Sequence, residues 1–575
     1  MALAICTVSV IHRSYSLMLL GGCQGRYLYL FTLTDWLTTS KLLEARDMSD
    51  VQPVLIAGTW RPADAEGTFK PKNPVTKEPT GEVYPVSTLK DVEEAIEAAS
   101  VAAEQIAEVG DEIVASFLER FAERIEARAE ELVAVANAES GLPASPRLAD
   151  IELPRTTDQL RQAAAAARSR SWTMPTIDTA SNIRSFYGAL GGGVAVFGPN
   201  NFPFAFNSVA GGDFAAAIAA GNPVIGKGNS SHPGTTRLLA EEALGAAEDT
   251  GMPAATVQLI YRTNHEVGAR LVSHPKIGAT GYTGSRGAGL VLKEAADKAG
   301  KPIYMELSSI NPVVILPGAL AERGEELAAE FTTSCLMGTG QFCTNPGVIL
   351  LLKGNDTDAF VQATSGKFAE APVGTMLTEA VENGMERSVG TLKGAGAEVL
   401  TGGERGGGNG FSYQNTLLKV DGGTFLQDPE ALQEEAFGNE SLLIVADDMD
   451  QAVEVARHFE GNLTGCIYSD SKGEDESHYR RIAPVLRKKV GRLLNDKMPT
   501  GVAVVPSMNH GGPYPATGHP GFTAVGLPGS IFRFAMLECY DNVREHRLPA
   551  ELRDQNPSGV LWRLIDQEWS QGDVG

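Results

Sequence analysis

Short apolar segments alternate with longer helical segments through the middle of this 575-residue chain, and this alternation constrains the fold most. Helices are predicted through 215–220 and over 234–248. The intervening strands are predicted at 194–197, 223–226, 257–260 and 278–283. Strands separated by helices form right-handed βαβ units and a parallel sheet. Because such sheets bind ligands at the carboxyl ends of their strands, functional residues are expected in the loops that follow them.

A second α/β region begins near residue 312 and continues to about residue 506. Its clearest predicted elements are strands at 312–316 and 347–352 and a helix at 321–339. The Gly- and Pro-rich segment 509–517 is predicted to be a loop that precedes a last strand near 531–534.

Two helices are predicted ahead of the first strand. Thr88 and Asp91 have the spacing of a capping box, and an apolar face follows at Val92, Ile96, Ala99, Ala103 and Ile106. A second apolar stripe runs from Ile113 to Leu132, and Gly141 is predicted to end that helix.

Charge and cysteine content exclude several classes of function. The net charge of −23 argues against a nucleic-acid-binding surface and against docking on anionic lipid. Six cysteines without a C-x-x-C spacing indicate free thiols in a reducing, cytoplasmic compartment. The nine histidines include no HExxH motif, which argues against a metal-dependent hydrolase, and no metal is predicted.

Residues 1–47 differ in composition from the remainder. Their apolar runs are too short and interrupted for a membrane span or a secretory signal. We interpret them as a spurious or dispensable leader, with an organelle-targeting leader as the alternative, and expect the working protein to start at Met48.

Four segments contain candidate chemistry, although each also has a structural explanation. Asn201, in GPNNFP, follows a strand, where an amide either shapes a turn or donates to an oxyanion. Gly284 and Ser285 lie in a glycine-rich turn that suits a phosphate but lacks the P-loop lysine. Glu306 stands between apolar residues, where burial is costly unless the carboxylate is paired or used. Cys343 lies in a turn-like segment, as a nucleophile requires, whereas Cys335 lies in a helical pattern.

Together these segments resemble the aldehyde dehydrogenase superfamily. The motifs are GPNNFP, YTGS, MELSS, GQFCT and EEAFG, and the resemblance extends from about Val51 to Phe534. HGGPYPAT and FCTNPG are most similar to the branch of α-ketoglutarate semialdehyde (2,5-dioxopentanoate) dehydrogenases and NADP-dependent aldehyde dehydrogenases. Three positions depart from the common pattern: Asn200, Ser308-Ser309 and Asn439.

The resemblance implies two parallel-sheet α/β domains, one Rossmann-like and one catalytic, plus a small oligomerisation β-element. We expect an NAD(P)-binding domain at 48–306 with a bridging β-element near 170–187. A catalytic domain is expected at 307–525, and an oligomerisation strand with a C-terminal tail at 526–575. The resemblance also implies a homo-dimer or homo-tetramer.

The implied reaction oxidises an aldehyde to a carboxylate with NAD(P)+. Cys343 would attack the aldehyde carbon and form first a thiohemiacetal and then a thioester. Asn201 would hold the oxyanion, and Glu306 would activate water for hydrolysis. A CoA-acylating enzyme characteristically lacks that glutamate, and a non-catalytic relative usually lacks the cysteine, so both alternatives are disfavoured.

The implied cofactor contacts are Lys227, Ser230, Gly284, Ser285, Glu435 and Phe437. Ser230 stands where many NAD-preferring relatives have a glutamate. Because removing a carboxylate removes repulsion against a ribose 2′-phosphate, we expect NADP+ use, with NAD+ as a second cofactor.

The implied substrate is α-ketoglutarate semialdehyde, oxidised to 2-oxoglutarate as in a 2,5-dioxovalerate dehydrogenase. The alternative is an NADP-dependent medium- or long-chain fatty aldehyde dehydrogenase. Phe202 and Phe206 are predicted to line the substrate tunnel. An oxo acid needs a cation, which Arg155 or Arg161 would supply, although both also suit an exposed helix face, the commoner situation.

Overall fold

The computed structural model describes residues 6–10, 13–17 and 51–575, and the chain divides into two units, 1–50 and 51–575. In the first unit, β1 (Cys6–Val10) pairs antiparallel with β2 (Arg13–Leu17). The leader prediction otherwise falls outside the described residues. No helix among those residues is both long and apolar enough to cross a membrane.

The first large sheet of the second unit has a Rossmann-like strand order. Its parallel strands are β9 (Gly193–Phe197), β10 (Val224–Lys227), β11 (Val257–Ile260), β12 (Ile277–Thr283) and β13 (Ile303–Glu306). The order in the sheet is β13-β12-β9-β10-β11, extended by the antiparallel hairpin β3 (Val54–Ile56) and β4 (Thr59–Arg61). The chain order therefore reverses between β9 and β12, where doubly wound sheets bind ligands.

The helices on this sheet confirm most of the predicted pattern. They include α2 (Leu89–Val109), α5 (Leu153–Ser169), α6 (Gly212–Ala219), α7 (Pro233–Thr250), α8 (His265–Ser273) and α9 (Arg286–Lys298). The predicted apolar face of α2 is buried.

Two predictions about the N-terminal helices were wrong. Thr88 precedes α2 but makes no capping bond, because the Asp91 carboxylate instead accepts the amide of Asp64 at 3.1 Å and pairs with Arg61 at 3.0 Å. The predicted second helix is two helices, α3 (Asp111–Ala127) and α4 (Ala129–Ser140), which break at Arg128. Gly141, at φ 68°, ends α4 as predicted.

The second large sheet is also mainly parallel. Its order is β16-β17-β18-β15-β14-β19-β20, and only β16 is antiparallel. These strands are β14 (Val313–Ile315), β15 (Val348–Leu352), β16 (Glu398–Thr401), β17 (Thr416–Asp421), β18 (Glu440–Ala446), β19 (Asn462–Tyr468) and β20 (Val490–Asn495). Val313 and Val314 belong to different buried clusters, one on each face, which explains the continuous apolar runs of these strands.

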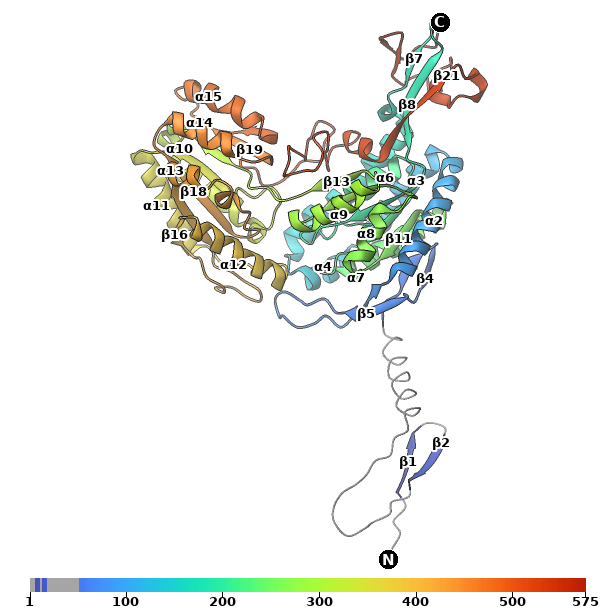
Figure 1. Cartoon of the computed structure of the whole chain (residues 1–575), viewed down its shortest axis with the longest axis horizontal. Coiled ribbons are helices and arrows are strands. Elements are labelled where there is room, and N and C mark those ends of the chain that lie inside the picture. The colour runs from blue at the N-terminus through green and yellow to red at the C-terminus, as the bar shows by residue number, and fades with distance from the viewer. Residues whose placement is uncertain (1–5, 11–12, 18–50) are drawn as a thin grey trace, which may run out of the picture. The chain divides into compact units, whose positions relative to one another are not determined.

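Helices cover both faces of the second sheet (Figure 1). They include α10 (Pro317–Leu336), α11 (Asn355–Glu370), α12 (Glu379–Gly394), α13 (Gly422–Gln427), α14 (Met449–His458) and α15 (Glu476–Arg487). Helix α10 starts four residues before the predicted boundary and gives way to a 3-10 turn at Met337–Gly340.

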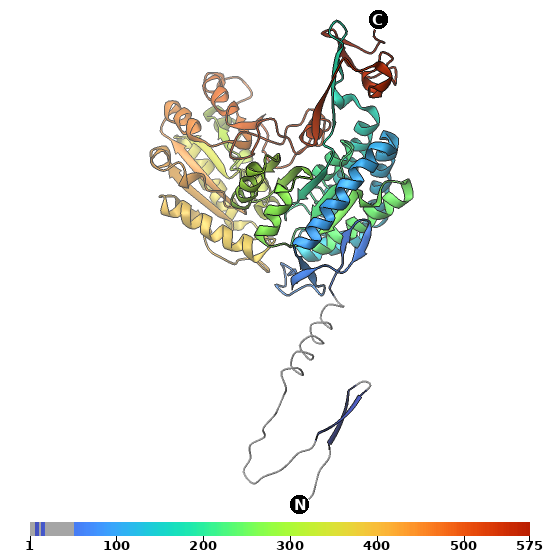
Figure 2. The same cartoon turned by 45° about the vertical axis from the view of Figure 1, so that its right-hand side comes forward.

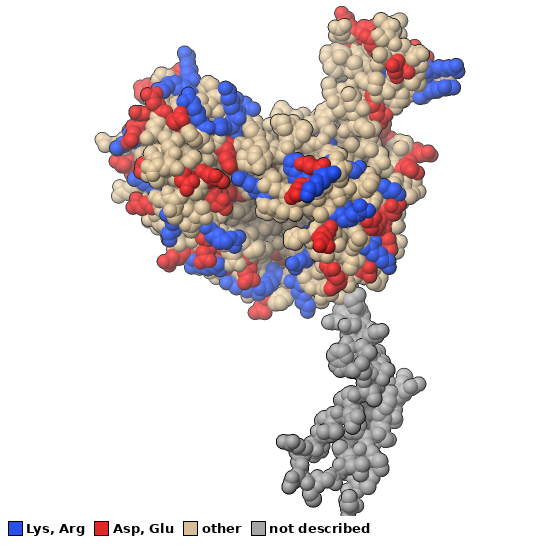
Figure 3. Space-filling model, viewed as in Figure 1, with Lys and Arg blue, Asp and Glu red and all other residues tan. Residues whose placement is uncertain are grey.

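A third sheet forms an arm that projects from the two-sheet body (Figures 1 and 2). Its order is β21-β8-β7-β22-β23, with β7 (Thr176–Asp178), β8 (Ile183–Ala189), β21 (Ala535–Asp541), β22 (Arg563–Ile565) and β23 (Glu568–Ser570). The prediction of a last strand near 531–534 was wrong. Residues 529–534 form a 3-10 helix in which Ile531 and Phe534 are buried, and the strand β21 follows it. Basic and acidic side chains are interleaved on the face shown in Figure 3.

Candidate active site

Cys343 lies in a loop between the 3-10 turn after α10 and strand β15. The side-chain amide of Asn311 donates to the carbonyls of Cys343 and Asn345, both at 2.9 Å. These two hydrogen bonds hold the backbone of the Cys343 loop in place. Gly340 has φ 68°, and a Cβ there would lie 2.0 Å from the carbonyl of Gly438. Only glycine fits this close approach, so the GQFC segment is held in one conformation.

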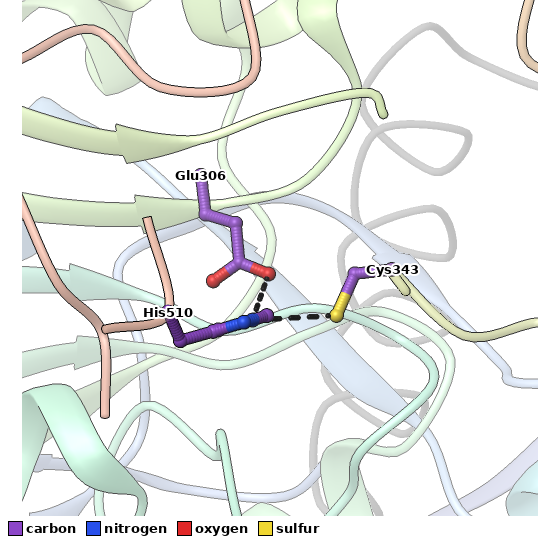
Figure 4. Close-up of side chains that lie close together, drawn as sticks. All are labelled: Glu306, Cys343 and His510. Carbon is purple, nitrogen blue, oxygen red and sulfur yellow. Dashed lines mark hydrogen bonds and ion pairs between the residues drawn. The ribbon is translucent and has the colours of Figure 1, made fainter. Parts of the chain in front are cut away.

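Glu306, Cys343 and His510 converge from three distant segments (Figure 4). The Nε2 atom of His510 lies 2.8 Å from Oε1 of Glu306 and 3.4 Å from Sγ of Cys343. Glu306 and His510 are each 1% exposed, whereas Cys343 is only partly buried. The cysteine is thus accessible, and the two groups able to exchange protons with it are shielded from solvent.

The charges around this trio act in opposite directions. Burial raises the pKa of the Cys343 thiol well above its usual value, the nearby Glu306 carboxylate raises it further, and Arg155 opposes both. Burial also tends to raise the pKa of Glu306, but the contact with His510 outweighs it and holds this pKa below the ordinary value. Glu306 is therefore ionised, and thiolate formation needs a proton acceptor and a compensating cation.

Asn201 lies beside this loop, in the segment that follows β9. Its Nδ2 donates to the carbonyl of Gln341 at 2.9 Å, while its own carbonyl accepts from Arg147 at 3.0 Å. One amide hydrogen is thus engaged with the backbone two residues before Cys343. The second hydrogen of the same Nδ2 is not used by that contact.

A cleft of about 910 Å³ opens at the carboxyl ends of the strands of the first sheet. This volume is that of a site for a cofactor-sized ligand. Its walls contain the three predicted catalytic residues and most of the predicted cofactor contacts: Asn201, Glu306, Cys343, Lys227, Gly284, Ser285, Glu435 and Phe437. The N-terminus of α9 opens onto the cleft, and no side chain caps it. Its free backbone N–H groups fit a pyrophosphate.

Lys227 lines one end of this cleft, and Arg262 lies near enough for its charge to act on Lys227. Burial lowers the pKa of Lys227 to about 8, and the neighbouring Arg262 contributes to the decrease. Ser230 does not line the cleft, whereas Asn229 next to it does. At the other end, burial raises the pKa of Glu435 to about 7 although its carboxylate accepts the amide of Ser309 at 3.1 Å.

An aromatic cluster of Phe202, Phe206, Phe342 and Phe522 packs beside the catalytic loop, to which Phe342 belongs. The ring of Phe202 lies 5.2 Å from that of Phe206 and 5.5 Å from that of Phe342. The predicted substrate residues Phe202 and Phe206 therefore lie outside the cleft walls but next to the catalytic loop.

The two arginines considered for substrate binding have different surroundings, although both lie on α5. Arg161 pairs with the exposed Glu126 at 2.6 Å, as an ordinary surface charge does. Arg155 instead stacks on the aromatic cluster, 5.8 Å from the ring of Phe202 and 5.3 Å from that of Phe206. Its Nε and Nη2 are buried without a hydrogen-bond partner among the described residues. The exposed-face interpretation holds for Arg161 but not for Arg155.

Comparisons with known proteins agree with this geometry. The aldehyde dehydrogenase family profile matches residues 60–512. The chain is 38% identical to an α-ketoglutaric semialdehyde dehydrogenase 2 of Azospirillum brasilense, over 88% of this chain and 97% of the relative. It is 36% identical to an α-ketoglutaric semialdehyde dehydrogenase of Acinetobacter baylyi, over 87% and 95%.

The chain belongs to the aldehyde dehydrogenase family. It is an enzyme of the class that oxidises aldehydes, and its fold is the two-domain α/β fold of that family. One similar solved structure is a mutant aldehyde dehydrogenase C from Pseudomonas syringae complexed with NAD+ and octanal. It has a TM-score of 0.72 and 21% identity, over 86% of this chain and 97% of the other.

The departures from the common family pattern are accommodated by local hydrogen bonds. Ser309 donates its amide to Glu435, and its hydroxyl contacts Asn311 at 2.9 Å. Asn439 donates to the carbonyl of Tyr413 at 2.8 Å. Asn200 lines the cleft beside Asn201. None of these three departures replaces Cys343, Glu306 or Asn201.

Two residues at the site were missed. His510 was noted only as the first residue of HGGPYPAT, because more than 160 residues separate it from Cys343. Arg262 follows β11 at the same sheet edge as Lys227, so the rule that ligands bind at strand ends indicates it.

Proposed function

We propose that this aldehyde dehydrogenase oxidises α-ketoglutarate semialdehyde to 2-oxoglutarate, with NADP+ as the main cofactor and NAD+ as a second one. In this proposal Cys343 Sγ forms a bond to the aldehyde carbon, and the carbonyl electron pair moves to oxygen. The second amide hydrogen of Asn201 and the backbone N–H of Cys343 stabilise the resulting oxyanion.

The cleft residues fit a nicotinamide dinucleotide. Lys227 and Arg262 suit the adenosine ribose and its 2′-phosphate, Ser285 and the N-terminus of α9 suit the pyrophosphate, and Glu435 with Phe437 suits the nicotinamide ribose and ring. When bound, the nicotinamide accepts the hydride that leaves the substrate carbon, so a thioester remains on Cys343. The charge of Lys227 in the cleft and that of the neighbouring Arg262 favour NADP+ over NAD+.

Glu306 supports hydrolysis of that thioester. Its carboxylate is buried, ionised and on the same cleft wall as Cys343, so it can remove a proton from attacking water. A CoA-acylating reaction needs no such base, and the presence of Glu306 therefore favours release of a free carboxylate.

The single observation that favours an oxo acid over a fatty aldehyde is the unpaired guanidinium of Arg155. Arg147 lies close by, but both of its terminal nitrogens are paired, one with Glu152 and the other with the carbonyl of Asn201. Arg155 retains unused, buried donors on the aromatic cluster, near enough to Cys343 for their charges to interact. A carboxylate would satisfy these donors, whereas an alkyl chain would leave them unpaired.

Replacement of Arg155 by Met tests this assignment. We expect kcat/KM for α-ketoglutarate semialdehyde to fall about tenfold to hundredfold, since a buried charged hydrogen bond contributes about 1.5–3 kcal/mol. Activity on octanal should be little changed. Arg161→Met, six residues further along the same helix, is the matched control and should affect neither substrate. An equal loss on both substrates in Arg155→Met would contradict the assignment.

We also infer that the protein forms a homo-dimer or homo-tetramer through its arm. Strand β21 is at the edge of the third sheet and exposes Met536 and Leu537. A seven-residue edge strand with exposed apolar side chains is suited to pairing with another copy. Leu537→Lys should lower the molar mass measured by light scattering, and an unchanged mass would argue against this surface.

A further inference from the structure

Arg147 contacts both of the segments that supply the proposed oxyanion donors. It belongs to the π-helical segment Ala144–Glu152, which leads into α5, and its side chain is 11% exposed. Its Nη2 atom donates to the carbonyl of Asn201 at 3.0 Å. Its guanidinium carbon lies 5.4 Å from the centre of the Phe342 ring, and Phe342 directly precedes Cys343. One buried cation therefore connects the Asn201 segment with the catalytic loop.

A buried carboxylate holds Arg147 in this position. The second terminal nitrogen of Arg147 pairs with Oε2 of Glu152, whose side chain is 0% exposed. Oε1 of Glu152 accepts the backbone amides of Phe204 and Ala205 at 2.8 and 3.0 Å. The two charged side chains thus bind three backbone groups within residues 201–205. Hydrogen bonds from charged groups are stronger and more directional than neutral ones, so they fix the path of this segment.

Asn201 needs a fixed backbone for its proposed role. Nδ2 uses one hydrogen for the carbonyl of Gln341 at 2.9 Å, so its second hydrogen has only one direction available. An oxyanion donor lowers the barrier only when it is in place before the charge develops. A displacement of about 1 Å at a reacting group can lower a rate about 10²-fold. A contact that holds the Asn201 backbone is therefore important for the rate even at a distance from the substrate.

We propose that Arg147 is a positioning residue for the oxyanion site and that it acts through Asn201. Its hydrogen bond to the Asn201 carbonyl keeps the side-chain amide directed at the aldehyde oxygen, close to the backbone N–H of Cys343. The guanidinium itself does not bind the substrate, because both of its terminal nitrogens are already paired. This inference rests on the proposed role of Asn201 in stabilising the oxyanion.

A neutral-pair variant tests the proposal without leaving a buried charge unpaired. Arg147→Met alone would leave the Glu152 carboxylate uncompensated, which destabilises a fold strongly. In Arg147→Met/Glu152→Gln the glutamine oxygen can still accept both backbone amides, whereas the donor to the Asn201 carbonyl is lost. Arg161→Met/Glu126→Gln neutralises an exposed pair that includes another α5 arginine and is the matched control.

The expected signature is a loss in kcat without a change in KM. In the neutral-pair variant, kcat and the first-turnover burst of NADPH should both fall about tenfold or more, equally with α-ketoglutarate semialdehyde and with octanal. KM for each aldehyde should change less than about twofold, since the oxyanion contact is made in the transition state. The control should match the wild type. A rise in KM confined to the oxo acid would show that Arg147 binds the substrate carboxylate and would overturn the proposal.

Combination with Asn201→Ala distinguishes positioning from a general loss of structure. If Arg147 acts through the Asn201 amide, the neutral pair should lower kcat less than about threefold further once that amide is gone. Effects that arise independently would multiply instead. A further loss as large as that in the wild-type background would therefore overturn the proposal.

Alkylation by iodoacetamide checks the nucleophile separately, because this reaction forms no oxyanion. The rate at Cys343 is followed by mass spectrometry, with the exposed Cys539 as internal reference, and should remain within about twofold of the wild type. The buried Cys335 and Cys466 stay protected only in folded protein and so report on the fold in the same samples. A large loss of Cys343 reactivity in a folded variant would place the effect on the catalytic loop and would overturn the proposal.

Arg147→Lys is the second variant if the neutral pair does not fold. Its ammonium keeps the charge beside Glu152 but lacks the planar fork that reaches two acceptors at fixed angles, so kcat should again fall and the loss should again disappear in Asn201→Ala. A wild-type kcat in Arg147→Lys would overturn the proposal. Failure of the proposed function is a separate result, because Asn201→Ala would then retain the wild-type kcat or the wild-type enzyme would form no NADPH from either aldehyde.

Discussion

The cleft and the aromatic cluster meet at Cys343 but are built in different ways. Lys227, Ser285 and Glu306 come from the carboxyl ends of three strands of one sheet or from the residues just after them. The aromatic cluster brings together the segment after β9, the catalytic loop and Phe522, and it is completed by Arg155 from α5. Its members are distant in sequence and have no common periodicity.

This difference separates what the reaction requires from what selects the aldehyde. Parallel strands place their carboxyl ends at one sheet edge, so the cleft follows directly from the topology. The aromatic cluster depends on how side chains of separate segments pack, and one substitution there alters its chemistry without altering the sheet. We therefore expect variants on the two sides to have separable effects.

The largest effect is expected where the two sides meet. Cys343→Ala removes the only atom that we assign to covalent chemistry, so kcat should fall by at least about 10⁴-fold with every aldehyde and both cofactors. Cys539→Ser, on the exposed arm, is the control and should retain wild-type turnover. Substantial turnover by Cys343→Ala would contradict a mechanism that passes through a thioester on Cys343.

A second variant, Glu306→Gln, separates acylation from hydrolysis. We expect steady-state kcat to fall about 10³-fold, as is typical for loss of a general base. A burst of one NADPH per active site should remain, because the glutamine leaves the nucleophile in place. Rapid-quench or stopped-flow absorbance measures both phases, and an unaltered steady state would exclude Glu306 as the base.

Most of the architecture of the first sheet could be predicted because its strands and helices each have one dominant periodicity. The predictions were wrong where a side chain contacts a residue distant in sequence and not its local neighbours. Asp91 reaches the loop at Asp64 instead of capping α2, and Ile531 with Phe534 is buried in a 3-10 helix although the pattern is typical of a strand. Such choices depend on contacts between distant segments, which local patterns do not contain.

Asn201→Ala tests the oxyanion contact on the cleft wall. We expect kcat to fall about 10²-fold, the usual loss for one oxyanion-hole donor. Asn200→Ala is the matched control, since the neighbouring amide lines the same cleft but has no assigned contact with the reacting oxygen. Equal losses in the two variants would indicate a general disturbance of the GPNNFP segment.

The smallest effect is expected at the phosphate end of the cleft. Arg262→Ala should raise KM for NADP+ about tenfold, equivalent to about 1.4 kcal/mol, while KM for NAD+ changes little. Arg270→Ala removes an exposed cation that pairs with Glu93 and serves as the control. An equal change for both cofactors would place Arg262 away from the 2′-phosphate.

The candidate site could be predicted only in part, because local motifs identify some of its residues whereas others are identified only by contacts between distant segments. Cys343, Glu306 and Asn201 were identified through motifs, and the structure brings them to one cleft. His510 could not be assigned, because nothing in the sequence near residue 510 shows that its ring reaches Glu306. The sequence did not distinguish Arg155 from Arg161. Their tertiary surroundings do, because Arg161 pairs with Glu126 whereas Arg155 stacks on Phe202 and Phe206.

We propose that the aromatic cluster with Arg155 selects an anionic aldehyde, while the cleft binds NADP+. The direct measurement is kcat/KM of the wild-type enzyme for α-ketoglutarate semialdehyde and for octanal, each at saturating NADP+. We expect a preference for the oxo acid of at least about tenfold, as one buried ionic hydrogen bond provides. An equal or higher kcat/KM for octanal would contradict it and favour a fatty aldehyde dehydrogenase.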